Sequence, residues 1–157
     1  MMHGILHTDR LLLKPAATAD APRLIAINEP TTPERITQFL ENQLNWWNEY
    51  SYGLWLIVLP ATGTLAGWCG LRPGGSPNEP ELLFGLAAGE RKRGIATEAV
   101  RAVLAYAFAL PTIKSVWAAT SENNFPSAAV MKRAGMSLEA QLELDGVSSV
   151  LYRVRAP

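Results

Sequence analysis

Apolar residues follow two spacings along this chain, and each change of spacing marks an expected change of secondary structure. Short apolar runs that end at glycine, proline or polar residues are typical of buried strands. Such runs predict strands at residues 10–14, 54–59, 65–71, 82–86 and 115–119. The pair Asp145-Gly146 is a typical hairpin turn, so two more strands are expected on either side of it, at residues 136–144 and 147–154.

Between these runs the apolar residues recur every three or four positions, which predicts amphipathic helices. The clearest stripe lies at residues 96–107, where the polar loop GERKRGIAT gives way to an apolar helix face. Asp20 is expected to cap a short helix, and Thr31 with Glu34 has the spacing of a capping box for the next one. A short fourth helix is expected at residues 127–133.

This order of elements predicts an α/β fold, in which a mixed sheet of seven strands carries helices on both faces. In such a sheet, ligands bind where neighbouring strands diverge at their carboxyl ends. Residues 72–80, RPGGSPNEP, are expected to form a loop between two strands. A chain of 157 residues is the size of one domain, so we expect a single domain over residues 1–157.

Composition excludes several classes of function. The formal net charge is zero, so the chain has no long-range attraction to nucleic acid. No apolar run reaches the ~20 residues that cross a bilayer, and the start MMHGILHTDR lacks the apolar region of a signal peptide. With two histidines and one cysteine there is no zinc spacing, and Cys69 has the setting of a buried, inert thiol. We therefore expect a soluble, cytoplasmic protein without a metal and without membrane or nucleic-acid partners.

The loop before the long helix has the features of an anion site. Arg91, Lys92 and Arg93 lie beside Gly94, whose missing Cβ leaves the backbone open to a ligand. The first N–H groups of a helix have no partner inside it, and the helix dipole adds about half a positive charge there. A run of charges is usually a solvated surface, but its place between a strand and a helix favours phosphate binding.

The motifs around this loop resemble those of the GCN5-related N-acetyltransferases, the GNAT family. Residues 91–96, RKRGIA, match the R/Q-x-x-G-x-G/A signature of that family, between the expected strand and helix. Other segments follow in the family's order: TDRLLLKPAATADAPRL, GTLAGWCGL, ELLFGL, GIATEAVRAVLAYAF, NFPSAAVMKRAGM and VLYRV. The first of these looks like the opening of the ribosomal-protein N-acetyltransferase branch. The ordered set spans nearly the whole chain.

The resemblance implies a GNAT fold with a mostly antiparallel sheet that splays between its fourth and fifth strands. It implies an N-acetyltransferase with acetyl-CoA as cosubstrate and a primary amine as acceptor, reacting by direct attack in a ternary complex. The loop would hold the pyrophosphate, and the end of the preceding strand would hold the pantetheine together with the loop on its far side. The implied cofactor-binding residues are Leu86, Ala87, Ala88, Arg91, Lys92, Arg93, Gly94, Ile95, Ala96, Thr97, Asn124 and Ser127.

Two positions depart from the family's pattern. Ala129 stands where the family often has an arginine, two residues after the serine of its N-x-x-S motif. Leu83 stands where the fourth strand usually has a glycine. Neither change removes the implied cofactor site, but both alter its fine geometry.

Ser127 and Glu81 are the candidate catalytic residues, and each has an alternative. Ser127 resembles the group that hydrogen-bonds the leaving thiol, although a serine in the first turn of a helix also serves as a cap. Tyr152 is the competing donor, with a place in the core as its other role. Glu81 heads the central strand, where the family often has a carboxylate that acts through water, and Glu79 and Glu139 are the alternative bases. The carbonyl oxygen is expected to be polarised by a backbone N–H near residues 86–87.

The acceptor side is less well specified. The branch resemblance favours a protein or peptide N-terminus, whose α-amine pKa of ~7.7–8.0 requires less help from a base than a lysine at ~10.4. Small amines and antibiotics are the alternative acceptors. Trp46 is a candidate lining residue of a ligand groove, with core packing as its other role. A rival function is an acyl-CoA-binding sensor or interaction module without turnover. The oligomeric state, monomer or homodimer, also stays open.

Overall fold

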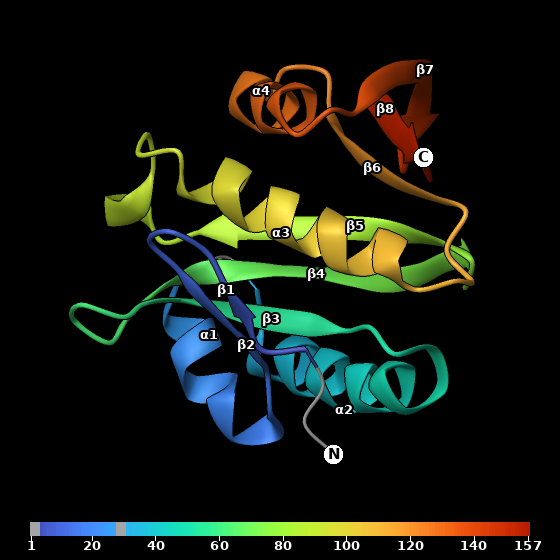
Figure 1. Cartoon of the computed structure of the whole chain (residues 1–157). Coiled ribbons are helices and arrows are strands. Elements are labelled where there is room, and N and C mark those ends of the chain that lie inside the picture. The colour runs from blue at the N-terminus through green and yellow to red at the C-terminus, as the bar shows by residue number, and fades with distance from the viewer. Residues whose placement is uncertain (1–3, 28–30) are drawn as a thin grey trace.

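The computed structural model describes residues 4–27 and 31–157 and shows one mixed sheet with helices on both faces (Figure 1). The strands are β1 (Leu6–His7), β2 (Leu12–Pro15), β3 (Leu54–Leu59), β4 (Thr64–Ser76), β5 (Glu79–Leu86), β6 (Ser115–Ser121), β7 (Ser137–Leu144) and β8 (Val147–Arg155). The helices are α1 (Ala21–Ile27), α2 (Pro33–Tyr50), α3 (Ile95–Ala109) and α4 (Phe125–Arg133). Short 3-10 turns lie at Thr18–Asp20 and Ala88–Glu90. All seven expected strands and all four expected helices are present.

The strand order is β1-β2-β3-β4-β5-β6-β8-β7, and every neighbouring pair except β5 and β6 is antiparallel. Strands β5 and β6 are parallel and share a single pair of facing residues, Glu81 and Trp117. The two strands separate beyond this pair, so the sheet splays where the resemblance placed the splay. In Figure 1, α3 crosses in front of β5, whereas α1 and α2 lie below β3.

The sheet differs from the prediction in two ways: it has an additional strand, and β4 and β5 are longer than expected. Strand β1 adds an eighth strand by pairing with β2 near the N-terminus. Residues 72–80 are not a loop, because β4 continues to Ser76 and pairs there with Glu79 across a two-residue turn. Gly74 and Gly75, which suggested a loop, instead lie where the register between β4 and β5 is irregular. A Cβ on Gly74 would lie 2.7 Å from Trp117, and Gly75 has a φ of +103°, so both glycines allow the strand to continue.

Two helix starts differ from the expectation by a few residues. The cap of α2 is Thr32 rather than Thr31, and its hydroxyl accepts a hydrogen bond from the Arg35 N–H at 3.2 Å. Pro33 then fills the first helical position, which needs no donor. Asp20 does not cap α1, because it lies inside the preceding 3-10 turn and accepts from the Ala17 N–H at 2.8 Å.

Strand β3, in the middle of the sheet, is buried on both faces, which explains its nearly continuous apolar run. Successive side chains of a strand point to opposite faces. In β3, Trp55 belongs to the core beneath α3, together with Val100, and Leu56 belongs to the core beneath α1 and α2, together with Leu40. The two helix layers are therefore fixed to opposite sides of the splayed sheet.

Cys69 is fully buried, and its burial raises the pKa of the thiol, as expected of an inert side chain. None of the helices in the described ranges is long and apolar enough to cross a membrane.

Candidate active site

The N-terminus of α3 is open to an anion. Gly94 is the N-cap in the left-handed region, at φ +74°, and no side chain caps the helix. The N–H groups of Ile95, Ala96 and Thr97 donate to no residue in the described part of the chain. A Cβ on Gly94 would meet only the Arg10 guanidinium, at 3.4 Å. The backbone donors and the positive end of the helix dipole therefore face free space, which is the arrangement that binds phosphates.

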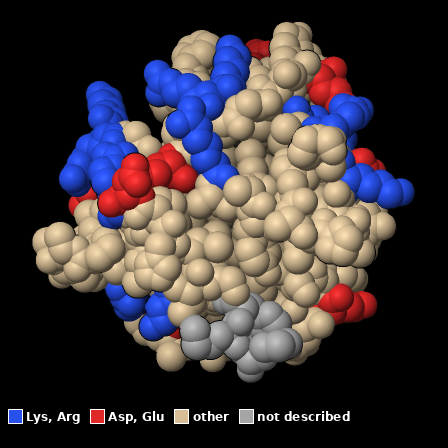
Figure 2. Space-filling view, in the orientation of Figure 1, with Lys and Arg blue, Asp and Glu red and all other residues tan. Residues whose placement is uncertain are grey.

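The three basic side chains of the loop lie differently. Arg93 forms an ion pair with Glu90 at 2.5 Å, and Arg91 reaches the Leu86 carbonyl at 3.5 Å. Lys92, at φ +65°, makes no ion pair with any described residue. Figure 2 shows that basic and acidic side chains intermingle over this end of the molecule. The N–H groups of residues 95–97 are thus more fully available to a phosphate than most of the cationic side chains are.

Sequence reasoning missed the residues that hold this helix end in place. Arg10 donates from Nε to Glu98 Oε1 at 2.7 Å and from Nη1 to the Arg93 carbonyl at 2.8 Å, and Thr8 also donates to Glu98. These bonds fasten the β1–β2 turn to the first turn of α3. No local pattern could reveal them, because 88 residues separate Arg10 from Glu98.

The pKa of Glu98 reflects these contacts. Burial acts to raise it, but the hydrogen bonds from Thr8 and Arg10 and the charge of Arg10 outweigh burial and lower the pKa. A carboxyl with a depressed folded-state pKa stabilises the fold above its unfolded pKa of about 4.3. This contribution is lost as the pH falls through the folded-state value.

Glu98→Gln is therefore expected to lower the melting temperature at pH 7, because the charged hydrogen bonds to Thr8 and Arg10 are weakened. The ion pair is half exposed on the arginine side, so the loss should be about 1 kcal/mol or less, or up to about 4 °C. Thermal unfolding from pH 7 to pH 3 tests this. The difference in melting temperature between Glu98→Gln and the wild type should decrease below about pH 4.3. A difference independent of pH would contradict a stabilising role of the Glu98 carboxylate.

The C-terminal end of β5 presents backbone groups to the splay. The Ala87 N–H donates to the Ala66 carbonyl of β4 at 2.8 Å, and the Ala87 carbonyl accepts from the Glu90 N–H at 2.9 Å. Backbone groups of successive strand residues point to opposite sides. The Leu86 N–H and carbonyl therefore face the β6 side. Of the two N–H groups expected near the carbonyl oxygen, that of Ala87 is bonded to β4, whereas that of Leu86 faces the splay.

At the start of α4, Asn124 takes the capping role that was the alternative interpretation of Ser127. Asn124 is the N-cap: its Oδ1 accepts from the Ser127 N–H at 3.2 Å, and its Nδ2 donates to Thr120 Oγ1 at 3.0 Å. The Ser127 hydroxyl makes no hydrogen bond with a described residue, so it is not the cap. The hydroxyl that sequence reasoning weighed as a structural group is left available to a ligand.

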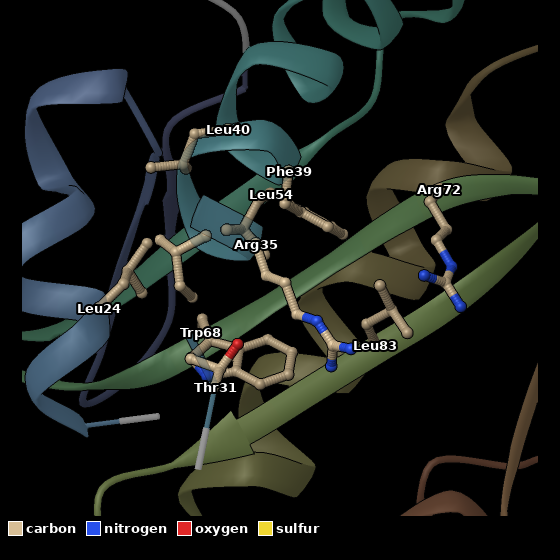
Figure 3. A pocket seen from close by; sticks show the side chains of 10 residues that line it. Leu24, Thr31, Arg35, Phe39, Leu40, Leu54, Trp68, Arg72 and Leu83 are labelled. Atoms are coloured by element: carbon tan, nitrogen blue, oxygen red, sulfur yellow. The ribbon is translucent and has the colours of Figure 1, made fainter. Parts of the chain in front are cut away.

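Glu81 is the third residue of β5 rather than its first, and it is 9% exposed. Its Oε1 accepts from Arg72 Nε at 2.7 Å across the β4–β5 pair. Arg72 and Leu83 line a cavity of about 260 Å³ between the sheet and α1 and α2. Figure 3 shows this cavity with Arg35 extending across it from α2. Glu81 thus lies on the sheet face opposite α3, beside a pocket that could receive an acceptor.

The alternative acid–base groups, Glu79 and Glu139, also have charged partners, as Glu81 has in Arg72. Glu79 accepts from the Ser115 hydroxyl at 2.8 Å and pairs with Arg153 at 3.5 Å. Glu139 pairs with Arg153 at 2.9 Å, and that hydrogen bond lowers its pKa, which makes it a weaker base. Tyr152 is 4% exposed and lies in the core beneath α3.

Trp46 does not line the 260 Å³ cavity. It packs edge-on against Phe39, with ring centroids 5.3 Å apart, and Phe39 forms the cavity wall. The Phe39–Trp46 pair therefore contributes packing next to the cavity, and Trp46 itself does not line it.

An uncapped helix start thus lies beside a parallel strand pair that splays apart. The acetyltransferase (GNAT) domain family matches residues 10–137 of the sequence. The chain belongs to the GNAT family of N-acetyltransferases. No functionally curated protein shows significant sequence similarity to it.

Solved structures agree with this family assignment. A protein described as a GnaT-family acetyltransferase from Bordetella pertussis is 25% identical, with a TM-score of 0.85 over 96% of this chain and 98% of that one. An acetyltransferase from Agrobacterium tumefaciens strain C58 is 27% identical, with a TM-score of 0.84 over 99% and 96%. RimL, a ribosomal L7/L12 α-N-protein acetyltransferase solved with coenzyme A, shares the fold at 16% identity, with a TM-score of 0.81 over 96% and 97%.

Proposed function

We propose that this GNAT protein transfers the acetyl group of acetyl-CoA to a primary amine by direct attack within a ternary complex. The observation that carries the proposal is the uncapped α3 start beside the splay of β5 from β6. A pyrophosphate at the helix start and a pantetheine along the free edge of β5 satisfy the unpaired backbone donors of both elements. Solved structures with the same fold, among them RimL in complex with coenzyme A and MccE in complex with acetyl-CoA, support the same cosubstrate.

Acetyl-CoA supplies an acetyl group already activated as a thioester. The N–H groups of residues 95–97 would hold the pyrophosphate. The Leu86 N–H would donate to the carbonyl oxygen as negative charge develops there, which is the preorganised stabilisation that acyl transfer requires. Attack by the amine nitrogen on the carbonyl carbon forms the C–N bond as the C–S bond breaks.

Two side chains would assist the reaction, one as a proton acceptor and one as a hydrogen-bond donor. Glu81, directly or through water, would accept the proton that the acceptor ammonium must lose before it attacks. Ser127, on the opposite wall of the splay, would donate a hydrogen bond to the departing thiolate. The thiol titrates near 8.5, so this donor assists departure without being indispensable.

Ser127→Ala is expected to lower turnover by about tenfold or less with acetyl-CoA affinity largely retained, because only the hydrogen bond to the leaving sulfur is lost. Its melting temperature should hardly change, since the Ser127 hydroxyl has no described partner. Steady-state kinetics and thermal unfolding test this pair of results.

Asn124→Ala is the matched control at the same helix start. It removes the observed cap of α4 and should cost about 1 kcal/mol of stability, or about 2–4 °C. If Ser127→Ala left turnover unchanged, its hydroxyl would have no role in departure of the thiol.

Release of free thiol from acetyl-CoA in the presence of an amine panel tests the function itself. The panel should include peptides with free N-termini, polyamines, aminoglycosides and amino acids. Amine-dependent release would support transfer. Binding of acetyl-CoA without release across the panel would instead favour the rival function, a sensor or interaction module that retains the cofactor cleft.

A further inference from the structure

The 260 Å³ cavity on the α1–α2 side of the sheet has the chemistry of a specific small ligand. Its wall is mainly apolar and is formed by Phe39, Leu40, Leu54, Trp68 and Leu83. The volume is below the range of about 300–1,000 Å³ found for drug-sized ligands. The described cavity therefore fits one apolar side chain with its attached polar groups better than a large polar molecule.

Leu83 defines one side of this cavity. It pairs with Gly70 across β4 and β5, and the neighbouring pairs on the same face are Trp68 with Gly85 and Arg72 with Glu81. An isobutyl group thus stands between the indole of Trp68 and the Arg72–Glu81 ion pair. An acceptor held near Glu81 meets apolar surface on the Trp68 side.

Arg35 gives the cavity an unbalanced positive charge. Arg72 is already paired with Glu81 at 2.7 Å, so these two charges offset one another. Arg35 also lines the cavity, is exposed, and makes no hydrogen bond or ion pair through its side chain with a described residue. Figure 3 shows it crossing from α2 toward Leu83. A guanidinium in this position can bind a carboxylate with two parallel hydrogen bonds.

We infer that the acceptor is a free α-amino acid with a large apolar side chain, such as leucine, methionine or phenylalanine. The α-amine lies toward Glu81, the α-carboxylate pairs with Arg35, and the side chain packs on the wall between Trp68 and Leu83. This inference rests on the proposed acetyl transfer and names its substrate class. A peptide N-terminus has the amine and the side chain but lacks the α-carboxylate, so Arg35 distinguishes the two.

The test compares L-leucine with L-leucinamide, which share the amine and side chain and differ in the carboxylate. The amide has the intrinsically more reactive amine at pH 7.5, because its α-amine is less basic. The wild type is nevertheless expected to favour leucine in kcat/KM by about tenfold or more, as a charge-assisted hydrogen bond would give. L-alanine should be a poorer substrate than leucine, because it leaves the apolar wall uncovered.

Arg35→Gln should bring the leucine-to-leucinamide ratio down to about one or below, with the KM for acetyl-CoA unchanged. Arg23→Gln is the matched control, since Arg23 is an exposed arginine on α1 that does not line the cavity. This control should retain the wild-type ratio. A wild-type preference for the amide or for a leucine-initiated peptide, or a ratio that Arg35→Gln leaves unchanged, would overturn the inference and leave acetyl transfer intact.

A measurement of leucine binding tests the amino-acid site independently of acetyl transfer. If no amine is acetylated, saturation-transfer NMR with coenzyme A present decides the matter. Leucine binding that Arg35→Gln abolishes would support the amino-acid site even in a protein without turnover. Absence of leucine binding to the wild type would overturn it.

Discussion

Gly94→Glu is expected to weaken acetyl-CoA binding by at least about a hundredfold, or about 2.7 kcal/mol. The substitution places a carboxylate at the helix start where the pyrophosphate is proposed to lie. The negative charge repels the phosphates, and the side chain can pair with Arg10, whose guanidinium lies 3.4 Å from the Cβ position. Calorimetric titration with acetyl-CoA measures the effect.

Gly94→Gln separates charge from backbone strain. Both variants place a side chain at φ +74°, which costs about 1 kcal/mol and lowers the melting temperature by about 2–4 °C. Glutamine has the bulk of glutamate without its charge, so its affinity loss should be clearly smaller. Unchanged affinity in the glutamate variant would show that the phosphates bind elsewhere.

Glu81→Gln is expected to reduce turnover by about 10²–10⁴-fold, the usual contribution of a general base. Glutamine keeps the size of the side chain and an oxygen that can accept from Arg72 Nε, so the fold should be retained. It cannot accept a proton from the acceptor ammonium. Acetyl-CoA affinity should not change, because Glu81 lies on the sheet face opposite α3. Single-turnover kinetics with the best acceptor of the panel measures the chemical step directly.

Glu79→Gln is the matched control on the same strand. Its carboxylate is directed to Ser115 and Arg153, so turnover should fall by no more than a few-fold. A similar loss in both variants would point to damage to β5 rather than to base catalysis. Turnover of Glu81→Gln within about threefold of the wild type would mean that the amine loses its proton to water.

The two sides of the sheet are suited to different parts of the reaction. The α3 side offers fixed backbone donors, which bind phosphates and polarise a carbonyl without having to rearrange. The α1–α2 side offers an apolar cavity and charged side chains, which select among acceptors. In the proposed reaction, the thioester and the amine would approach β5 from opposite faces of the sheet.

Most of the helices and strands, and the helix start at which a phosphate is proposed to bind, could be predicted from the sequence alone. The strand ending at Leu86, the turn at Gly94 and the helix after it are each specified by residues within a few positions of one another. The spacing of apolar residues, a glycine at positive φ and an uncapped helix start depend on neighbouring residues. They can therefore be predicted from short stretches of sequence.

Which residues face one another depends on strand register and on the packing of helices against the sheet. The register of β4 with β5 paired Arg72 with Glu81, directed Leu86 rather than Ala87 to the splay, and converted an expected loop into strand. The packing of α2 on the sheet brought Arg35 to the cavity beside that ion pair. Such contacts join residues far apart in sequence, and they depend on register and packing, which the burial of the whole core fixes and no short pattern encodes.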